Sequence, residues 1–259
     1  MPVVVSGVVL WDFDGTLAWR PGLWGGCVLE VLDEQAPGHT AELETVRRAM
    51  RAGFPWHDHA RPHPELSDPE AWWRAVTQLI ADAIRDCVAE SRVAELAHAV
   101  ARRYADGTRG WRVFDDTRAG LGETAAAGWR NVVLSNHIPE LETLVTQLGL
   151  GDLVERVFSS ACTGYEKPHP EAFRIALRAE GNPRRRWMVG DNPLADVEGA
   201  EALGIPAILV RTSGSTRRSA VDVATAARMI VAEYAHPRRA GANRLRAAGS
   251  RQHPSEESQ

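Results

Sequence analysis

The chain has 259 residues and a mass of 28.4 kDa, enough to bury a sizeable core in one large domain or two small ones. Its 44% apolar and 25% charged residues, net charge of −4 and pI of about 6.2 are ordinary for a globular protein and do not indicate a nucleic-acid partner. The apolar stretches are too short to span a membrane, the first residues do not resemble a signal peptide, and the three dispersed cysteines form no disulfide or zinc pattern, so we expect a cytoplasmic protein.

Short apolar runs alternate with helical patterns along much of the chain. The runs are continuous rather than alternating, which is typical of strands buried on both faces of a parallel sheet. This order predicts an α/β fold with a doubly wound parallel sheet. The expected strands are Val8–Phe13, Val132–Ser135, Val157–Ser159, Trp187–Gly190 and Ala207–Val210. The expected helices between them are Thr117–Ala127, Pro139–Leu148, Pro170–Ala179 and Leu194–Leu203.

Residues 18–108 interrupt this alternation with helical patterns and no convincing strand, and they are too many for a loop. We expect a helical insertion here, with residues 1–17 and 109–215 forming the core. The segment also holds five of the nine tryptophans, which we expect mainly to form the insertion's own core. The expected helices are Gly26–Glu34, Ala41–Arg51, Asp68–Ala89 and Ser91–Ala105.

The C-terminal region contains two expected parts. A last helix is expected near Val221–Tyr234, within residues 216–235. Residues 236–259 are polar and show no periodicity, which predicts a disordered tail.

Two carboxylates follow the first expected strand. Asp12 and Asp14 alternate to the same side, and Gly15 allows a sharp turn directly after them. Ligands of open α/β sheets bind at the carboxyl ends of the strands, and two like charges there need a cation or a shared proton. Hard oxygen ligands suit Mg²⁺, so the sequence predicts a magnesium site.

Further polar residues follow three other expected strands. Ser135 and Asn136 either form an anion cradle at a helix start or cap that helix. Lys167 is the single lysine among 30 basic residues, which suggests a site that needs a compact ammonium group. Asp191 and Asp196 flank the next helix start, where acids also act as caps. Capping alone does not explain four such groups at one sheet edge.

These motifs, DFDGT, SN, KP and GDNPLAD, resemble those of the haloacid dehalogenase-like hydrolase superfamily in order and spacing. The resemblance spans residues 12 to 196. It implies a Rossmann-like core with a helical cap inserted after the first motif. It also implies a Mg²⁺-dependent phosphatase that acts on a small phosphate monoester, a small-molecule partner.

The resemblance assigns a role to each motif residue. Asp12 is the expected nucleophile and Asp14 the expected acid and base, with the Asp14 backbone carbonyl also binding the metal. Further roles are metal binding for Asp191, phosphate binding for Ser135, Asn136 and Lys167, and orientation of Lys167 or a metal-bound water for Asp196. Asn192 stands where some members carry another acid.

Asp14 also distinguishes between reactions of the superfamily, because the dehalogenating members lack an acid at this position and use no metal. A phosphomutase or phosphotransferase with the same covalent step, and a non-catalytic binding protein, are the alternatives. The sequence does not identify the phosphate ester or the oligomeric state.

Substrate choice is expected to depend on the insertion. A loop with three histidines, residues 53–63, is predicted to be solvated or to face the substrate. A zinc site there is a less favoured hypothesis. We expect Arg20, Trp24, Trp56 and His57 to line the substrate cleft.

Overall fold

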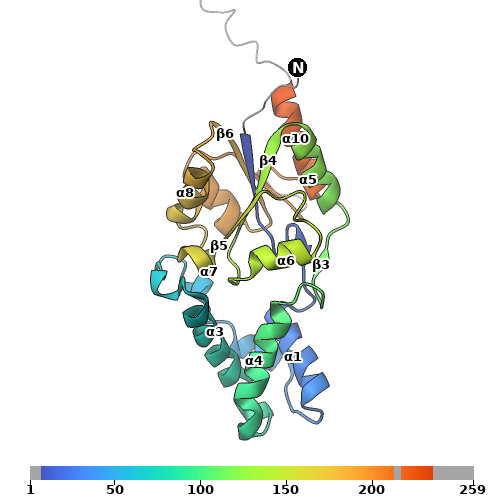
Figure 1. The fold of residues 1–259 in the computed structure, drawn as a ribbon, viewed down its shortest axis with the longest axis vertical. Coiled ribbons are helices and arrows are strands. Elements are labelled where there is room, and N and C mark those ends of the chain that lie inside the picture. The colour runs from blue at the N-terminus through green and yellow to red at the C-terminus, as the bar shows by residue number, and fades with distance from the viewer. Residues whose placement is uncertain (1–6, 213–216, 236–259) are drawn as a thin grey trace, which may run out of the picture.

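The computed structural model describes residues 7–212 and 217–235 (Figure 1). Five parallel strands form the central sheet in the order β5-β4-β1-β6-β7. The chain fills one side of β1 and then crosses to the other, so β1 lies at the topological switch point, where open α/β sheets bind ligands. The strands are β1 (Gly7–Trp11), β4 (Trp129–Ser135), β5 (Arg156–Ser159), β6 (Arg185–Gly190) and β7 (Ala207–Leu209).

Both faces of the sheet are covered by helices. All five residues of β1 are buried, and the side chains of the last four alternate between two apolar clusters. Val8 and Leu10 pack in one cluster with Phe173 of α8, whereas Val9 and Trp11 lie in the other cluster, which includes residues of α5 and α10. Figure 1 shows α8 on one side of the sheet and α5 and α10 on the other. The core helices are α5 (Thr117–Ala126), α6 (Leu141–Gln147), α7 (Ser160–Thr163), α8 (Pro170–Ala179), α9 (Gly199–Glu201) and α10 (Val223–Ala235).

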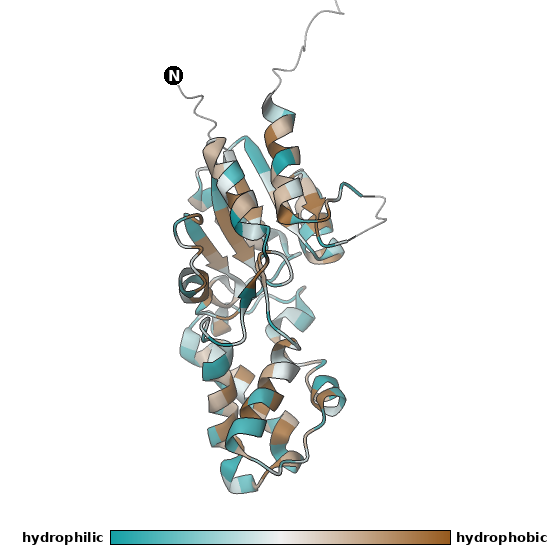
Figure 2. Cartoon of the chain, turned by 90° about the vertical axis from the view of Figure 1, so that its right-hand side faces the viewer, coloured by the Kyte–Doolittle hydropathy of each residue, from teal (hydrophilic) through white to brown (hydrophobic). Residues whose placement is uncertain are grey.

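A helical segment is inserted between β1 and β4. We call the part from α1 to α4, residues 23–104, the cap. In Figure 2, brown apolar residues concentrate in the strands and alternate with teal polar residues along the helices. The cap helices are α1 (Leu23–Gln35), α2 (Leu43–Ala49), α3 (Pro69–Ile84) and α4 (Val93–Tyr104), with short 3-10 turns at Pro55–Asp58, Pro64–Leu66, Arg85–Cys87 and Glu90–Arg92.

The structure confirms the predicted α/β fold, its five strands and the inserted helices. One prediction was wrong, because residues 18–108 contain a short strand, β2 (Ala18–Trp19), which pairs antiparallel with β3 (Arg112–Val113). The helix expected from Leu194 begins instead as a π-helical turn, Pro193–Glu198, and α3 ends at Ile84 rather than at residue 89. The predicted tail, residues 236–259, lies outside the described residues.

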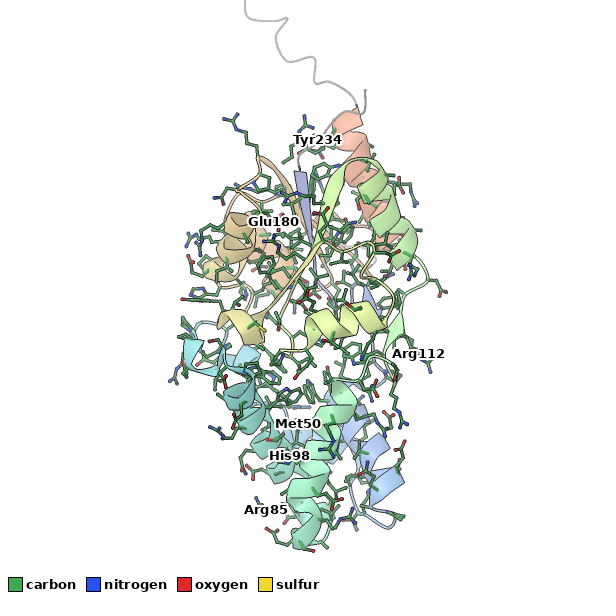
Figure 3. All side chains as sticks on the ribbon, in the orientation of Figure 1. Met50, Arg85, His98, Arg112, Glu180 and Tyr234 are labelled. Atoms are coloured by element: carbon green, nitrogen blue, oxygen red, sulfur yellow. The ribbon has the colours of Figure 1, made fainter. Side chains whose placement is uncertain are left out.

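The cap faces the carboxyl ends of the strands (Figure 1). Figure 3 shows Glu180 and Tyr234 at the end of the core away from the cap, and Arg85 and His98 on the cap itself. The loops that follow β1, β4 and β6 therefore lie between the core and the cap. Among the described residues, no helix combines the length and apolar character that crossing a membrane requires.

Candidate active site

Asp12 lies at the centre of a buried polar cluster at the end of β1. Its backbone N–H donates to the Val189 carbonyl at 2.9 Å and so continues the pairing with β6. Asp12 Oδ1 accepts hydrogen bonds from Ser135 Oγ at 2.8 Å and from Lys167 Nζ at 2.7 Å. Thr16 Oγ1 lies 3.4 Å from Oδ2. The Asp12 side chain is therefore held in place by a charge-assisted bond from Lys167 and a hydrogen bond from Ser135.

Lys167 connects this aspartate to a second one. Its Nζ also donates to Asp196 Oδ1 at 2.6 Å, and the lysine is 3% exposed. Burial alone would lower the pKa of Lys167, but the charges of Asp12 and Asp196 raise it, so the ammonium stays charged.

Asn136 positions the backbone of Lys167. Its Oδ1 accepts from Lys167 N–H at 2.7 Å and its Nδ2 donates to the Lys167 carbonyl at 2.8 Å. We expected this amide to bind phosphate, and the structure gives it a different set of partners. Asn136 Nδ2 carries two hydrogens, and these two bonds use one of them.

Two glycines let the remaining aspartates approach. Gly15 has a φ of +80°, and a Cβ there would lie 2.4 Å from Asp191 Oδ2. A Cβ on Gly190 would lie 2.1 Å from Asp196 Oδ2. Any side chain at either position would push a carboxylate out of the cluster. Asp196 Oδ2 also accepts from Asn192 N–H at 3.0 Å, so both of its oxygens have protein partners.

The carboxylates raise one another's pKa. Burial, followed by the charges of Asp12 and Asp191, raises the pKa of Asp14 to about 8. Burial and the charges of Asp12 and Asp196 also raise the pKa of Asp191. Four carboxyl groups here face one ammonium, that of Lys167, so the protein alone does not balance the charge if all four ionise.

A divalent cation fits this arrangement. Oxygen atoms of Asp12, Asp191 and Asp196 all lie within 4.8 Å of one another. They are hard ligands of the type that Mg²⁺ prefers, and a cation would relieve their repulsion. The sequence analysis named Asp12 and Asp191 as metal ligands, and the structure places their oxygens near those of Asp196, the acid that also binds Lys167.

The cluster opens into a cavity of about 310 Å³ between the core and the cap. Leu23 and Trp56 form its cap side. A second cavity of about 120 Å³ adjoins it and has Trp24 in its wall. A larger cavity of about 670 Å³ lies between α3 and α4, with no motif residue in its lining. Trp24 and Trp56 thus reach the cleft, as we expected.

Arg20 and His57 do not line either cleft cavity, in contrast to our expectation. Arg20 is 3% exposed and donates to Glu30 and, at 2.6 Å, to the Arg109 carbonyl. Its guanidinium therefore stabilises the base of the cap. His57 packs edge-on against Phe54, with ring centroids 5.5 Å apart.

One contact that no sequence pattern predicts joins the cap to the loop that carries Lys167. His63 Nε2 lies 3.0 Å from Glu166 Oε1, and His63 N–H donates to the Gly164 carbonyl at 2.9 Å. Both side chains are buried. The loop with three histidines therefore contributes a cap-to-core ion pair. Its partner, Glu166, precedes the single lysine, but nothing in the sequence links the two segments.

The fold and this cluster define a Rossmann-like α/β core with a buried aspartate at the switch point of its parallel sheet. A family model described as haloacid dehalogenase-like hydrolase matches residues 7–204. The chain belongs to this family, which confirms the resemblance seen in the sequence.

Individual relatives agree with this assignment. The chain is 30% identical over 213 residues to the human haloacid dehalogenase-like hydrolase domain-containing protein 3, covering 78% of this chain and 81% of that one. It is 36% identical over 124 residues to a phosphoserine phosphatase of Thermus thermophilus, about half of each chain. A 2-haloacid dehalogenase from Pseudomonas syringae shares the fold, with a TM-score of 0.64, 22% identity and coverage of 88% of this chain and 99% of that one.

Proposed function

We propose that this hydrolase is a Mg²⁺-dependent phosphatase that cleaves a small phosphate monoester through a phosphorylated Asp12. The observation that carries the proposal is the buried Asp12 carboxylate, held by Ser135 and Lys167 at the mouth of the cleft. A carboxylate fixed in this way beside an ammonium group is a suitable nucleophile.

The proposed first step transfers the phosphoryl group. An Asp12 oxygen attacks phosphorus, the bond between phosphorus and the ester oxygen breaks, and Asp14 gives its proton to the leaving oxygen. The raised pKa of Asp14, about 8, supports this role because the group keeps its proton near neutral pH. In the second step water attacks phosphorus, its proton returns to Asp14, and phosphate leaves Asp12.

Lys167 and Asp196 support both steps. The Lys167 ammonium lies against Asp12, where it neutralises charge that develops on the phosphoryl oxygens. Asp196 accepts a hydrogen bond from the same ammonium at 2.6 Å and fixes its direction. Asp196 is therefore a positioning residue in this account.

Mg²⁺ would be held by Asp12 and Asp191, with the Asp14 backbone carbonyl as the resemblance implies. When bound, the ion offsets the negative charge of the phosphate and the carboxylates. The crowding of aspartate oxygens within 4.8 Å supports the site.

The relatives support the reaction but not a substrate. The Thermus relative is named a phosphoserine phosphatase, whereas the Pseudomonas structure is named a dehalogenase and shows only a shared fold. The acid at Asp14 favours phosphate chemistry for this chain, because the dehalogenating members lack it.

Radiolabelled acetyl phosphate separates the two steps. Its leaving group needs no proton, so Asp14→Asn should still phosphorylate Asp12 but hydrolyse the intermediate slowly. We expect label to accumulate on Asp14→Asn, to turn over on the wild type and to be absent from Asp12→Asn. Label on Asp12→Asn would show that another residue is the nucleophile.

A further inference from the structure

The smaller of the two cleft cavities has a distinct chemistry, and we call it the leaving-group chamber. It measures about 120 Å³, well below the roughly 300–1,000 Å³ of sites for drug-sized ligands. It shares Asp14, Leu23, Trp56 and Asn136 with the larger cavity, so the two are adjacent. A phosphate ester bound at Asp12 would place its alcohol part on the Asp14 side. The other lining residues are Trp24, Tyr104, His137 and Ile138.

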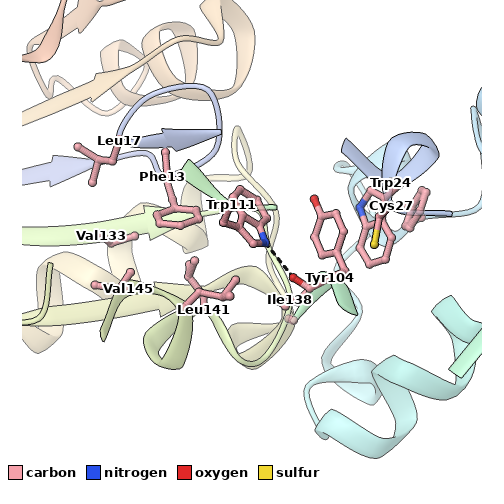
Figure 4. Close-up of a cluster of buried hydrophobic side chains, with 14 of the residues drawn as sticks. Phe13, Leu17, Trp24, Cys27, Tyr104, Trp111, Val133, Ile138, Leu141 and Val145 are labelled. Atoms are coloured by element: carbon pink, nitrogen blue, oxygen red, sulfur yellow. Dashed lines mark hydrogen bonds between the residues drawn. The ribbon is translucent and has the colours of Figure 1, made fainter. Parts of the chain in front are cut away.

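Aromatic rings form the cap side of the leaving-group chamber. Trp24 stacks on Tyr104 with ring centroids 3.6 Å apart and an interplanar angle of 5°, and Trp56 stacks on Trp24 at 6.5 Å. Figure 4 shows Trp24 and Tyr104 at the cap end of an aromatic series that continues through Trp111 to Phe13 in the core. The walls are thus fixed by packing and present apolar surface to a ligand.

The polar groups contributed by Tyr104 and His137 are uncharged. His137 is 3% exposed, and burial lowers its pKa to about 3, so the ring is neutral. Within residues 7–212 and 217–235, neither ring nitrogen of His137 has a hydrogen-bond partner. Burial also raises the pKa of the Tyr104 hydroxyl. A neutral hydroxyl or carbonyl group suits such partners, because buried polar atoms left without a bond are costly.

The cations nearest the leaving-group chamber are already engaged. Among the described residues that line either cavity, Lys167 is the single cationic side chain, and its ammonium binds Asp12 and Asp196. Arg20 lies behind Tyr104, 5.9 Å from the ring centroid, but Glu30 and the Arg109 carbonyl hold it there. A carboxylate or second phosphate in the chamber would be buried without a counter-charge, which is strongly unfavourable.

We propose that the leaving-group chamber selects phosphate monoesters whose alcohol part is small and uncharged, and rejects esters that carry a second anionic group. The inference rests on the proposed phosphatase function and adds the class of substrate. It assigns the discrimination to the aromatic wall and the neutral polar groups of this chamber.

The test compares two esters of nearly equal size, glycol monophosphate and phosphoglycolate. The first carries a hydroxymethyl group where the second carries a carboxylate. We expect kcat/KM for glycol monophosphate to be at least about 100-fold higher on the wild type. Acetyl phosphate serves as an independent check that the site transfers phosphoryl groups. Equal or better hydrolysis of phosphoglycolate would overturn the inference and leave the proposed function standing.

A charge placed on the wall should relax the discrimination. Leu23 lines both cavities and is 45% exposed, so Leu23→Arg adds a cation there without burying it. We expect this variant to lower the ratio of kcat/KM for glycol monophosphate to kcat/KM for phosphoglycolate by about tenfold or more, because the phosphoglycolate carboxylate gains a cationic partner. Val221→Arg makes the same change at a position that is 67% exposed and outside the cleft, and it should leave the preference unchanged.

Each remaining outcome is decisive. If Leu23→Arg folds and the preference does not change, the chamber does not control selectivity and the inference is wrong. If acetyl phosphate is hydrolysed but neither ester is, the assigned class of substrate is wrong. If wild type releases phosphate from none of the three, the proposed function fails and the inference fails with it.

Discussion

Glu166→Gln tests how the cap is fixed to the core. The Glu166 side chain has no exposed surface, and His63 Nε2 lies 3.0 Å from its Oε1. Glutamine keeps the size and an acceptor for His63 but removes the charge. Hydrogen bonds to charged groups contribute about 1.5–3 kcal/mol and neutral ones about 0.5–1.5 kcal/mol. We therefore expect the variant to lose about 1–2 kcal/mol of unfolding free energy where His63 is protonated.

The loss should depend on pH in one direction. Burial alone would lower the pKa of His63, but the hydrogen bond and charge of Glu166 raise it above its ordinary value. A pKa raised on folding stabilises the protein fully below the unfolded value, about 6.5, and this contribution is lost as pH rises through the folded value. The difference in unfolding free energy between wild type and Glu166→Gln should thus be largest below about pH 6.5 and shrink above it.

Urea unfolding at a series of pH values measures this difference. Glu70→Gln is the matched control, because Glu70 pairs with Arg74 on the surface and its side chain is 85% exposed. It should change the unfolding free energy by less than about 0.5 kcal/mol at every pH. A Glu166→Gln effect that is independent of pH, or that grows as pH rises, would refute the ion-pair account.

Lys167→Met should lower kcat by at least about 100-fold in a phosphate-release assay, because Asp12 loses the ammonium at 2.7 Å; a loss below about tenfold would contradict this role. Asn131→Leu should destabilise the core by about 1–3 kcal/mol, because the buried Trp11 Nε1 is left unbonded, whereas Thr124 Oγ1 keeps its backbone acceptors. Asn131 Oδ1 accepts from Trp11 Nε1 at 3.0 Å and from Thr124 Oγ1 at 2.7 Å. Thermal unfolding measures this change, and an unaltered midpoint would count against the network.

The motif residues were predictable because each follows an apolar strand. Asp12, Ser135 and Asp191 come directly at or after the ends of β1, β4 and β6, and parallel strands bring their carboxyl ends to one edge. The continuous apolar runs were sufficient to locate the strands. The topology then determined that these side chains lie together.

The contacts between distant segments were not predictable in the same way. His63 and Glu166 are 103 residues apart, and no pattern in either segment specifies the partner. Arg20 follows the first motif closely, yet its guanidinium points away from the cleft because it pairs with Glu30 on α1. The spacing of apolar residues within a segment indicates which face of a helix or strand is buried. The partners of side chains from distant segments depend instead on how those segments pack together.

Asp12 is the proposed nucleophile of a Mg²⁺-dependent phosphatase. The most direct test of this role is phosphate release from acetyl phosphate, with Mg²⁺ and with a chelator, for wild type, Asp12→Asn and the exposed control Asp115→Asn. We predict turnover that needs Mg²⁺, that Asp12→Asn abolishes and that Asp115→Asn retains. Turnover that survives in folded Asp12→Asn would contradict the account.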